Sequence, residues 1–187
     1  MTSTSASTGS GWLWTAPSPR RPSGGPDTGP NPTDRAKTGT KRSVICDAAG
    51  IPIGLAVAGA NRHDQKLLEP TLDALIIRPP EPDDDTEPMV IGLCLDRGYR
   101  TKQIPLIVAE RGMLAHIQAR DEEIAARQFD PTWKARRWVI ERTHSWLNRF
   151  RGLLIRWSKK TENHTAFLQL ACAVITWRSI PRHLLPR

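Results

Sequence analysis

The sequence is poor in cysteine and has no apolar run long enough for a membrane. Its three cysteines, Cys46, Cys94 and Cys172, lie far apart in apolar surroundings. This pattern excludes a disulfide framework and the usual zinc spacings, and it favours reduced thiols. No apolar run reaches the roughly 18 residues of a membrane span, and the first 25 residues lack the apolar core of a signal peptide. We therefore expect a cytoplasmic protein without a membrane partner.

Acidic residues are nearly absent from the carboxyl-terminal third. Between Pro131 and Arg187 there are 12 Lys and Arg but only two acids, Glu141 and Glu162, a net charge of +10. The whole chain carries +8, so the remainder is slightly acidic. Basic charge confined to one segment favours binding of a polyanion there, and the alternative is an ordinary solvated surface.

Regular periodicity is missing from the amino-terminal part. Residues 1–40 are rich in Ser, Thr, Pro and Gly, which predicts an irregular arm. Residues 41–180 predict one folded domain, and residues 181–187 a short tail.

The folded part alternates strand and helix patterns. Arg42–Asp47 and Ile51–Ala58 predict a hairpin closed by residues 48–50, and Asp64–Ile77 predicts a helix. The further expected elements are strands over Met89–Leu95 and Leu114–Gln118 and helices over Ile104–Arg111, Trp133–Leu154 and Asn163–Ile180. This order favours an α/β fold, a mixed sheet flanked by helices. With one more strand before the hairpin, inside the arm, it would be the ribonuclease-H-like order.

Asp96 is the first candidate for a carboxylate that takes part in catalysis. It follows an apolar strand and precedes a turn, at the edge where open α/β sheets place their sites. Two-metal phosphoryl transfer needs such carboxylates around two ions. The alternative is that Asp96 only caps the turn.

Glu141 is the second candidate. On a helical wheel it lies with Ser145 and Asn148, opposite an apolar stripe expected to face the core. That stripe consists of Val139, Trp146, Phe150 and Leu153. The alternative is an ordinary ion pair with Arg137.

Four motifs in order resemble insertion-sequence transposases of the ribonuclease-H-like DDE class, the insertion-sequence-five family in particular. They are residues 29–35 (GPNPTDR), 59–64 (GANRHD), 95–99 (LDRGY) and the pattern Arg137, Glu141, Arg142, Trp146, Leu147. The resemblance implies that Asp96 is the second catalytic Asp, that Glu141 is the catalytic Glu, and that both bind Mg²⁺ or Mn²⁺. It also implies a homodimer on the terminal inverted repeats of the element, which would be cut and joined in DNA transposition, a form of DNA recombination.

Basic residues near Glu141 are the expected contacts to DNA phosphates. They are Arg137, Arg142, Arg149, Arg151, Arg156, Lys159 and Lys160. The family often has Lys where this chain has Asn148, and Arg149 beside it is a candidate substitute.

The family's first Asp is missing from its expected place. Trp14 is encoded only by TGG and Thr15 by ACN, so GAC, an Asp codon, spans the two codons in a shifted frame. We infer that residues up to about Gly25 are a frameshifted reading, with the first strand missing or altered. The alternative is a divergent arm in which another acid, Asp47 before Asp34 or Asp64, replaces the lost ligand.

Three functions stay open on this basis. The first is a transposase that cleaves and transfers DNA strands with metal ions, inactive here if the first Asp is lost. The second is a non-catalytic DNA-binding remnant, and the third, less favoured by the motifs, is a host nuclease.

Overall fold

The computed structural model describes residues 10–16, 25–32, 35–77, 91–117, 128–129, 138–181 and 183, with only the backbone of residues 10–16. Expectations for Asp34, Arg137 and the start of the helix after Trp133 fall outside the described residues.

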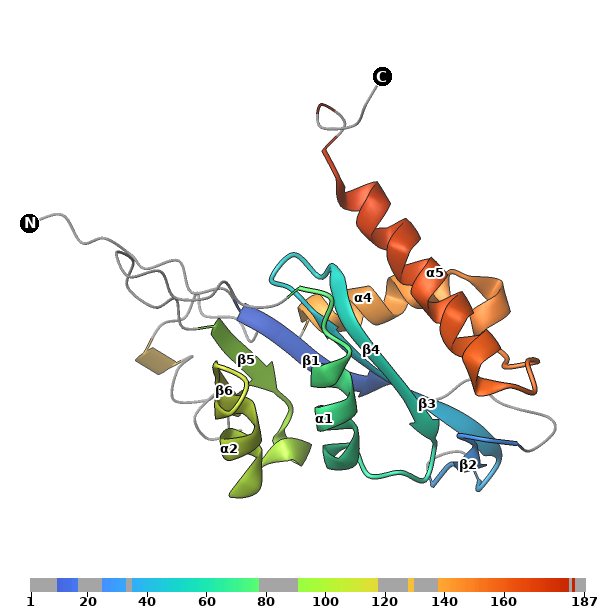
Figure 1. Ribbon diagram of the computed structural model, residues 1–187, viewed down its shortest axis with the longest axis horizontal. Coiled ribbons are helices and arrows are strands. Elements are labelled where there is room, and N and C mark those ends of the chain that lie inside the picture. Colours follow the sequence, from blue (N-terminus) through green and yellow to red (C-terminus); the bar gives the residue numbers. More distant parts are fainter. Residues whose placement is uncertain are drawn as a thin grey trace, which may run out of the picture.

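The core of the molecule is a mixed sheet (Figure 1). Its strands run in the order β2-β3-β1-β5-β6, with β4 paired to β3. The bounds are β1 Ser10–Ala16, β2 Gly29–Pro30, β3 Thr38–Cys46, β4 Pro52–Gly59, β5 Ile91–Leu95 and β6 Met113–Ile117. β1 is antiparallel to β3 and parallel to β5, and β6 is parallel to β5. This confirms the predicted α/β class, a mixed sheet flanked by helices and consistent with the ribonuclease-H-like order.

The arm is not irregular throughout, which corrects the sequence prediction. Strand β1 occupies the centre of the sheet between β3 and β5, and β2 and the start of β3 also precede residue 41. The residues of β1, SGWLWTA, include aromatic and β-branched types that favour strands. Seven residues between Pro- and Gly-rich stretches form no visible period, but two neighbouring strand edges provide partners for the backbone groups.

The predicted hairpin is confirmed as β3 and β4. Its turn needs Gly50, which has φ of +81°, a conformation that glycine adopts without steric cost. Asp47 completes the turn, since its Oδ1 accepts hydrogen bonds from the backbone N–H groups of Ala49 and Ile51 at 2.9 and 2.8 Å.

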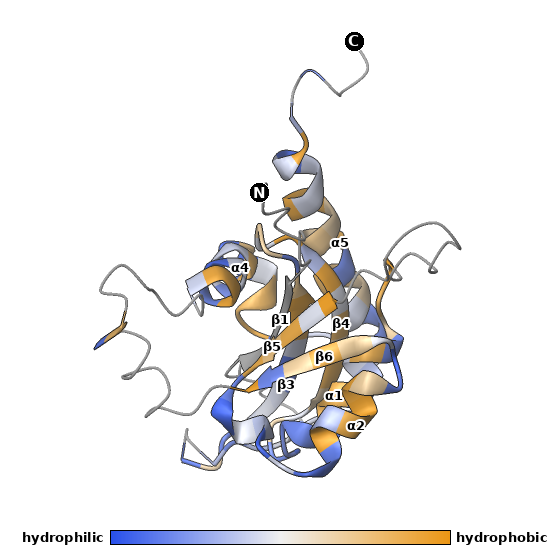
Figure 2. Cartoon of the chain, turned by 90° about the vertical axis from the view of Figure 1, so that its left-hand side faces the viewer, coloured by the Kyte–Doolittle hydropathy of each residue, from blue (hydrophilic) through white to orange (hydrophobic). Residues whose placement is uncertain are grey.

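Helices cover both faces of the sheet (Figure 2). α1 (Gln65–Asp73) and α2 (Gln103–Ala109) pack on one face around Ile45, Leu68 and Leu93. α4 (Trp138–Asn148) and α5 (Thr161–Ser179) pack on the other around Val44, Leu147 and Leu168. Alternate residues of β3 therefore pack into two separate hydrophobic cores, one on each face of the sheet, as the two-residue period of a strand requires. Among the described residues, no helix is long and apolar enough to cross a membrane.

Two helices end earlier than their periodicity predicts. α1 stops at Asp73 rather than Ile77, and α4 stops at Asn148 rather than Leu154. After α4, Phe150 is extended (φ −80°, ψ 98°) and a single 3-10 turn, η2 (Arg151–Leu153), follows. The change of direction lets Leu153 reach the core without continuing the helix.

The buried stripe of α4 is also rotated from the prediction. Its buried residues are Val139, Ile140, Thr143, His144 and Leu147. Trp146 and Phe150 are only partly buried, because the helix lies in the angle between the sheet and α5 rather than flat on one surface.

Candidate functional site: carboxylates and a basic surface

Asp96 stands directly after β5, as the sequence predicts. Its extended backbone (φ −71°, ψ 160°) caps the 3-10 turn η1 (Arg97–Tyr99), and its Oδ1 accepts a hydrogen bond of 2.7 Å from the N–H of Arg97. Gln65 at the start of α1 donates to the carbonyl of Gly98 at 2.7 Å and so braces the same turn. Asp96 is half-buried, so its position is fixed while part of its carboxylate stays accessible. It caps the turn and can still serve as a ligand.

Glu141 lies in the first turn of α4 and is exposed. Its helix is anchored at this end, because Thr143 donates to the carbonyl of Gly50 at 2.7 Å and Arg142 donates to the carbonyl of Ala49. The same exposed face carries Ser145 and Asn148, as predicted. Among the described residues no ion pair involves Glu141, and the alternative of a pair with Arg137 falls outside them.

The two carboxylates come from elements that touch the same strand. β5, which leads into Asp96, pairs with β1, and α4, which carries Glu141, packs against β1. In the register of β1 and β5, Leu13 lies opposite Leu95, so the next positions bring the backbone of Trp14 beside Asp96. The Asp codon that a shifted frame would read spans Trp14 and Thr15. A carboxylate at that level would lie next to Asp96, and the sequence has none there.

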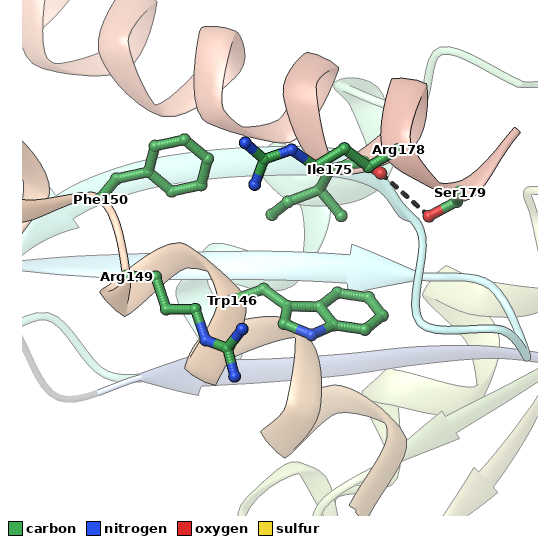
Figure 3. A pocket seen from close by; sticks show the side chains of 6 residues that line it. All are labelled: Trp146, Arg149, Phe150, Ile175, Arg178 and Ser179. Atoms are coloured by element: carbon green, nitrogen blue, oxygen red, sulfur yellow. Dashed lines mark hydrogen bonds between the residues drawn. The ribbon is translucent and has the colours of Figure 1, made fainter.

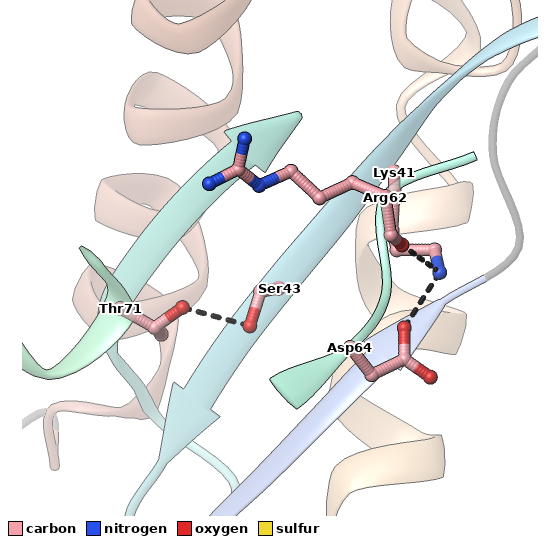
Figure 4. Close-up of polar contacts among 5 residues, drawn as sticks. All are labelled: Lys41, Ser43, Arg62, Asp64 and Thr71. Atoms are coloured by element: carbon pink, nitrogen blue, oxygen red, sulfur yellow. Dashed lines mark hydrogen bonds and ion pairs between the residues drawn. The ribbon is translucent and has the colours of Figure 1, made fainter. Parts of the chain in front are cut away.

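Asp47 and Asp64, the two possible replacements that the structure describes, have structural contacts. Asp47 holds the hairpin turn. In the β1–β3 register it lies beyond the pair Trp12–Cys46, about three residues or 10 Å along the strands from the level of Asp96. Asp64 accepts from Lys41 Nζ at 2.6 Å, and Lys41 also donates to the carbonyl of Arg62 at 2.8 Å (Figure 4). The same face of the sheet carries the hydrogen bond from Thr71 to Ser43, at 2.8 Å.

The described residues contain no group of three or more His, Cys, Asp or Glu side chains placed to hold a metal ion. Carboxylate oxygens such as those of Asp96 and Glu141 are the ligands that Mg²⁺ prefers. Their side chains are therefore of the type that binds a divalent ion, and no third carboxylate completes a site among the described residues.

Four of the basic residues expected to bind DNA are exposed. Arg149 and Arg151 follow α4, and Lys159 and Lys160 precede α5. All four lie in the connection between the two helices, residues 149–160, and give it positive charge.

Arg156 is buried, which corrects the prediction that it contacts DNA phosphates. It is only 1% exposed and its guanidinium is committed to internal hydrogen bonds. The acceptors are the carbonyls of Pro26, Asp27 and Ser158 and the hydroxyls of Thr40 and Thr161, at 2.8 to 3.3 Å. A side chain so placed cannot reach a phosphate. It joins the amino-terminal segment to the start of α5.

Arg142 is likewise held by the protein. Its guanidinium lies over the rings of Trp138 and Trp146, at 4.7 and 4.9 Å from the centroids. Such cation–π contacts add to its hydrogen bond with Ala49. Its first role is to fasten α4 to the hairpin.

Sequence reasoning missed Arg42 on β3. It is 3% exposed, and its Nη2 donates to Oδ1 of Asn148 at 2.9 Å. Its Nε and Nη1 have no hydrogen-bond partner among the described residues. Burial lowers the pKa of Arg42 to about 10, so it is still charged at neutral pH. A Lys at position 148 would place a second positive charge beside the buried guanidinium of Arg42. The neutral Asn148 accepts a hydrogen bond from that guanidinium instead.

Comparisons with known proteins agree with the motifs. Residues 13–176 match the family described as the transposase DDE domain. The chain is 38% identical over 160 residues to the transposase assigned to insertion sequence element IS402 of Burkholderia cepacia. That match covers 85% of this chain and 72% of the relative. The chain belongs to the DDE transposase family.

Proposed function

We propose that this chain binds the ends of an insertion sequence and that its centre for DNA strand cleavage lacks one carboxylate. The observation that carries the proposal is the register of β1 and β5, in which Leu13 pairs with Leu95, so that Trp14 and Asp96 are the next residues of the two chain segments. The shifted Asp codon at Trp14 and Thr15 falls at the same level.

Asp96 and Glu141 are the two remaining candidate ligands. Divalent ions, Mg²⁺ or Mn²⁺, would activate the attacking hydroxyl and stabilise the leaving oxygen when bound. The N–H of Arg97 fixes one oxygen of Asp96, so the carboxylate is oriented before an ion arrives. Glu141 is available on α4. We expect their carboxyl groups to lie about 4–8 Å apart, as ions about 3.5–4 Å from each other require.

Binding to DNA depends on a different set of groups. Arg149, Arg151, Lys159 and Lys160 are exposed, and cations of this kind give affinity for the phosphate backbone rather than for a base sequence. We expect a homodimer to hold two inverted repeats. Loss of one metal ligand would weaken cleavage severely and leave this binding intact.

The experiment compares three proteins on a duplex that carries the end of the element. They are the present chain, Trp14→Asp, and a version with the frame restored between residues 14 and 25. The present chain should bind without nicking in Mg²⁺ or Mn²⁺, and the restored version should nick. Glu141→Gln in the restored version is the control and should abolish nicking without weakening binding.

Efficient nicking by the present chain would contradict the proposal. If Asp47→Ala then abolished it, Asp47 would be the replacement ligand. If nicking survived Asp47→Ala and failed with Asp96→Ala, another acid, such as Asp34, would hold that role.

A further inference from the structure

A cavity of about 500 Å³ opens between the carboxyl-terminal parts of α4 and α5 (Figure 3). Its walls are Trp146, Arg149, Phe150, Ile175, Arg178 and Ser179. The size is within the range of roughly 300–1,000 Å³ found for sites that bind small molecules. Asp96 and Glu141 are not among the residues that line it.

The polar side of this cavity is cationic. Arg149 and Arg178 lie across it from each other, on different helices or their ends (Figure 3). None of the six wall residues is acidic, and no ion pair within the described residues engages either guanidinium. Two guanidinium groups without a carboxylate favour an anion, and their planar forks match phosphate oxygens.

The apolar side consists largely of aromatic rings. Trp146 and Phe150 are partly buried and Ile175 is 6% exposed. The indole of Trp146 has Arg142 over its ring at 4.9 Å, and Arg142 is itself bonded to Ala49. The ring is therefore held in place before a ligand binds. Fixed aromatic rings beside arginines are the features that bind nucleobases, at about 1–3 kcal/mol per stacked base.

We propose that this cavity binds one unpaired nucleotide of the DNA, with its base against Trp146 and Phe150 and its phosphate on Arg149 and Arg178. The inference rests on the proposed function, since it presumes that DNA lies along α4. A base inside a duplex is stacked on both faces, so only a nucleotide taken out of the stack can enter.

The cavity opens on a different side of α4 from Glu141. Trp146 follows Glu141 by five residues, which is about 8 Å of helical rise and about 140° around the helix, and Arg149 is the first residue after the helix. The nucleotide that enters is therefore not the one whose phosphate lies next to Glu141.

The test uses an end duplex of the element with 2-aminopurine at successive positions. Each position is either paired or placed opposite an abasic site. Affinity is measured by fluorescence anisotropy at fixed salt, and stacking by quenching of the 2-aminopurine. The present chain should bind the unpaired form about fivefold or more tightly than the paired form, with quenching confined to the position whose base enters the cavity and absent next to the cleavage position.

Variants separate this site from general DNA binding. Arg178→Gln and Phe150→Leu should remove the preference for the unpaired form and leave affinity for the paired duplex within about twofold. Arg151→Gln, an exposed arginine outside the cavity, is the matched control and should weaken both forms equally. Thermal unfolding of each variant verifies that it is folded.

Duplex binding with no preference for the unpaired form would overturn this inference and leave the proposed function intact. A preference that Arg178→Gln and Phe150→Leu both leave unchanged would also overturn it. Failure to bind either form would overturn the proposed function as well.

Discussion

Arg156 and Thr40 lie 116 residues apart in the sequence and are joined by a buried hydrogen bond of 2.8 Å between Nη1 and Oγ1. The same guanidinium bonds the carbonyls of Pro26 and Asp27. One arginine therefore fixes the segment that follows the first strand against the start of α5.

Replacing Arg156 should unfold the protein more easily without changing how DNA binding depends on salt. Arg156→Gln leaves buried carbonyls without a donor, so the free energy of unfolding should fall by about 2–5 kcal/mol. Urea unfolding measures this. Arg151→Gln, the exposed control, should change stability by less than about 0.5 kcal/mol. Equal effects of the two variants would show that the buried hydrogen bonds of Arg156 do not stabilise the fold.

The exposed arginines after α4 should set the salt dependence of DNA binding. Each phosphate contact contributes about 0.9 to the slope of log K against log salt. The double variant Arg149→Gln, Arg151→Gln should therefore reduce the slope by about two. Arg111→Gln removes a cation that pairs with Asp73 at 2.8 Å on the opposite side of the sheet. It should leave the slope unchanged, and a loss as large as that of the double variant would argue against a localised DNA surface.

Removing the buried cation of Arg42 should stabilise the fold. Its Nε and Nη1 lack partners in the part of the chain that the structure describes, and a buried charge without full hydrogen bonding costs more than an apolar side chain of similar size. Arg42→Met should raise the free energy of unfolding by about 1–3 kcal/mol, since the exposed Asn148 can bond to water instead. Asn148→Ala in the native background should lower stability, because it removes a hydrogen-bond acceptor of the cation. A destabilised Arg42→Met would mean that the guanidinium meets an anion in solution.

Alkaline pH should destabilise the protein through Cys46. Burial raises the pKa of its thiol from 9.0 to about 12. The stability that the buried, neutral thiol of Cys46 contributes is fully present below pH 9. As pH rises from 9 towards 12 the unfolded thiol ionises and the folded one does not, so this contribution falls by about 1.4 kcal/mol per pH unit.

The Cys46→Ala variant isolates this effect. It should be less stable than the native protein at pH 7, yet its stability should fall less steeply above pH 9. Urea unfolding at pH 7.5, 9, 10 and 11 gives the two slopes. Cys172→Ala should behave similarly over a narrower window, since burial raises the pKa of Cys172 only to about 11. Identical slopes for native protein and Cys46→Ala would show that the folded thiol ionises normally.

The sequence alone determined the elements whose patterns are local. The hairpin of β3 and β4, the apolar strand that ends at Asp96 and the exposed face of α4 that carries Glu141 all follow from periods of two or 3.6 residues. The basic character of the last third also follows from composition, and the four motifs were sufficient to suggest the family.

Only the tertiary structure decided that β1 is a strand and which arginines are free. The backbone of β1 is hydrogen-bonded to β3 and β5, which come 22 or more positions later in the chain. No local pattern of hydrophobic residues therefore predicts this strand. Arg149 and Arg156 look alike in the sequence, but Arg156 meets the carbonyl of Asp27 from 129 residues away. Burial of an arginine depends on which distant acceptors the fold brings next to its guanidinium. The residues that neighbour it in the sequence do not predict these acceptors.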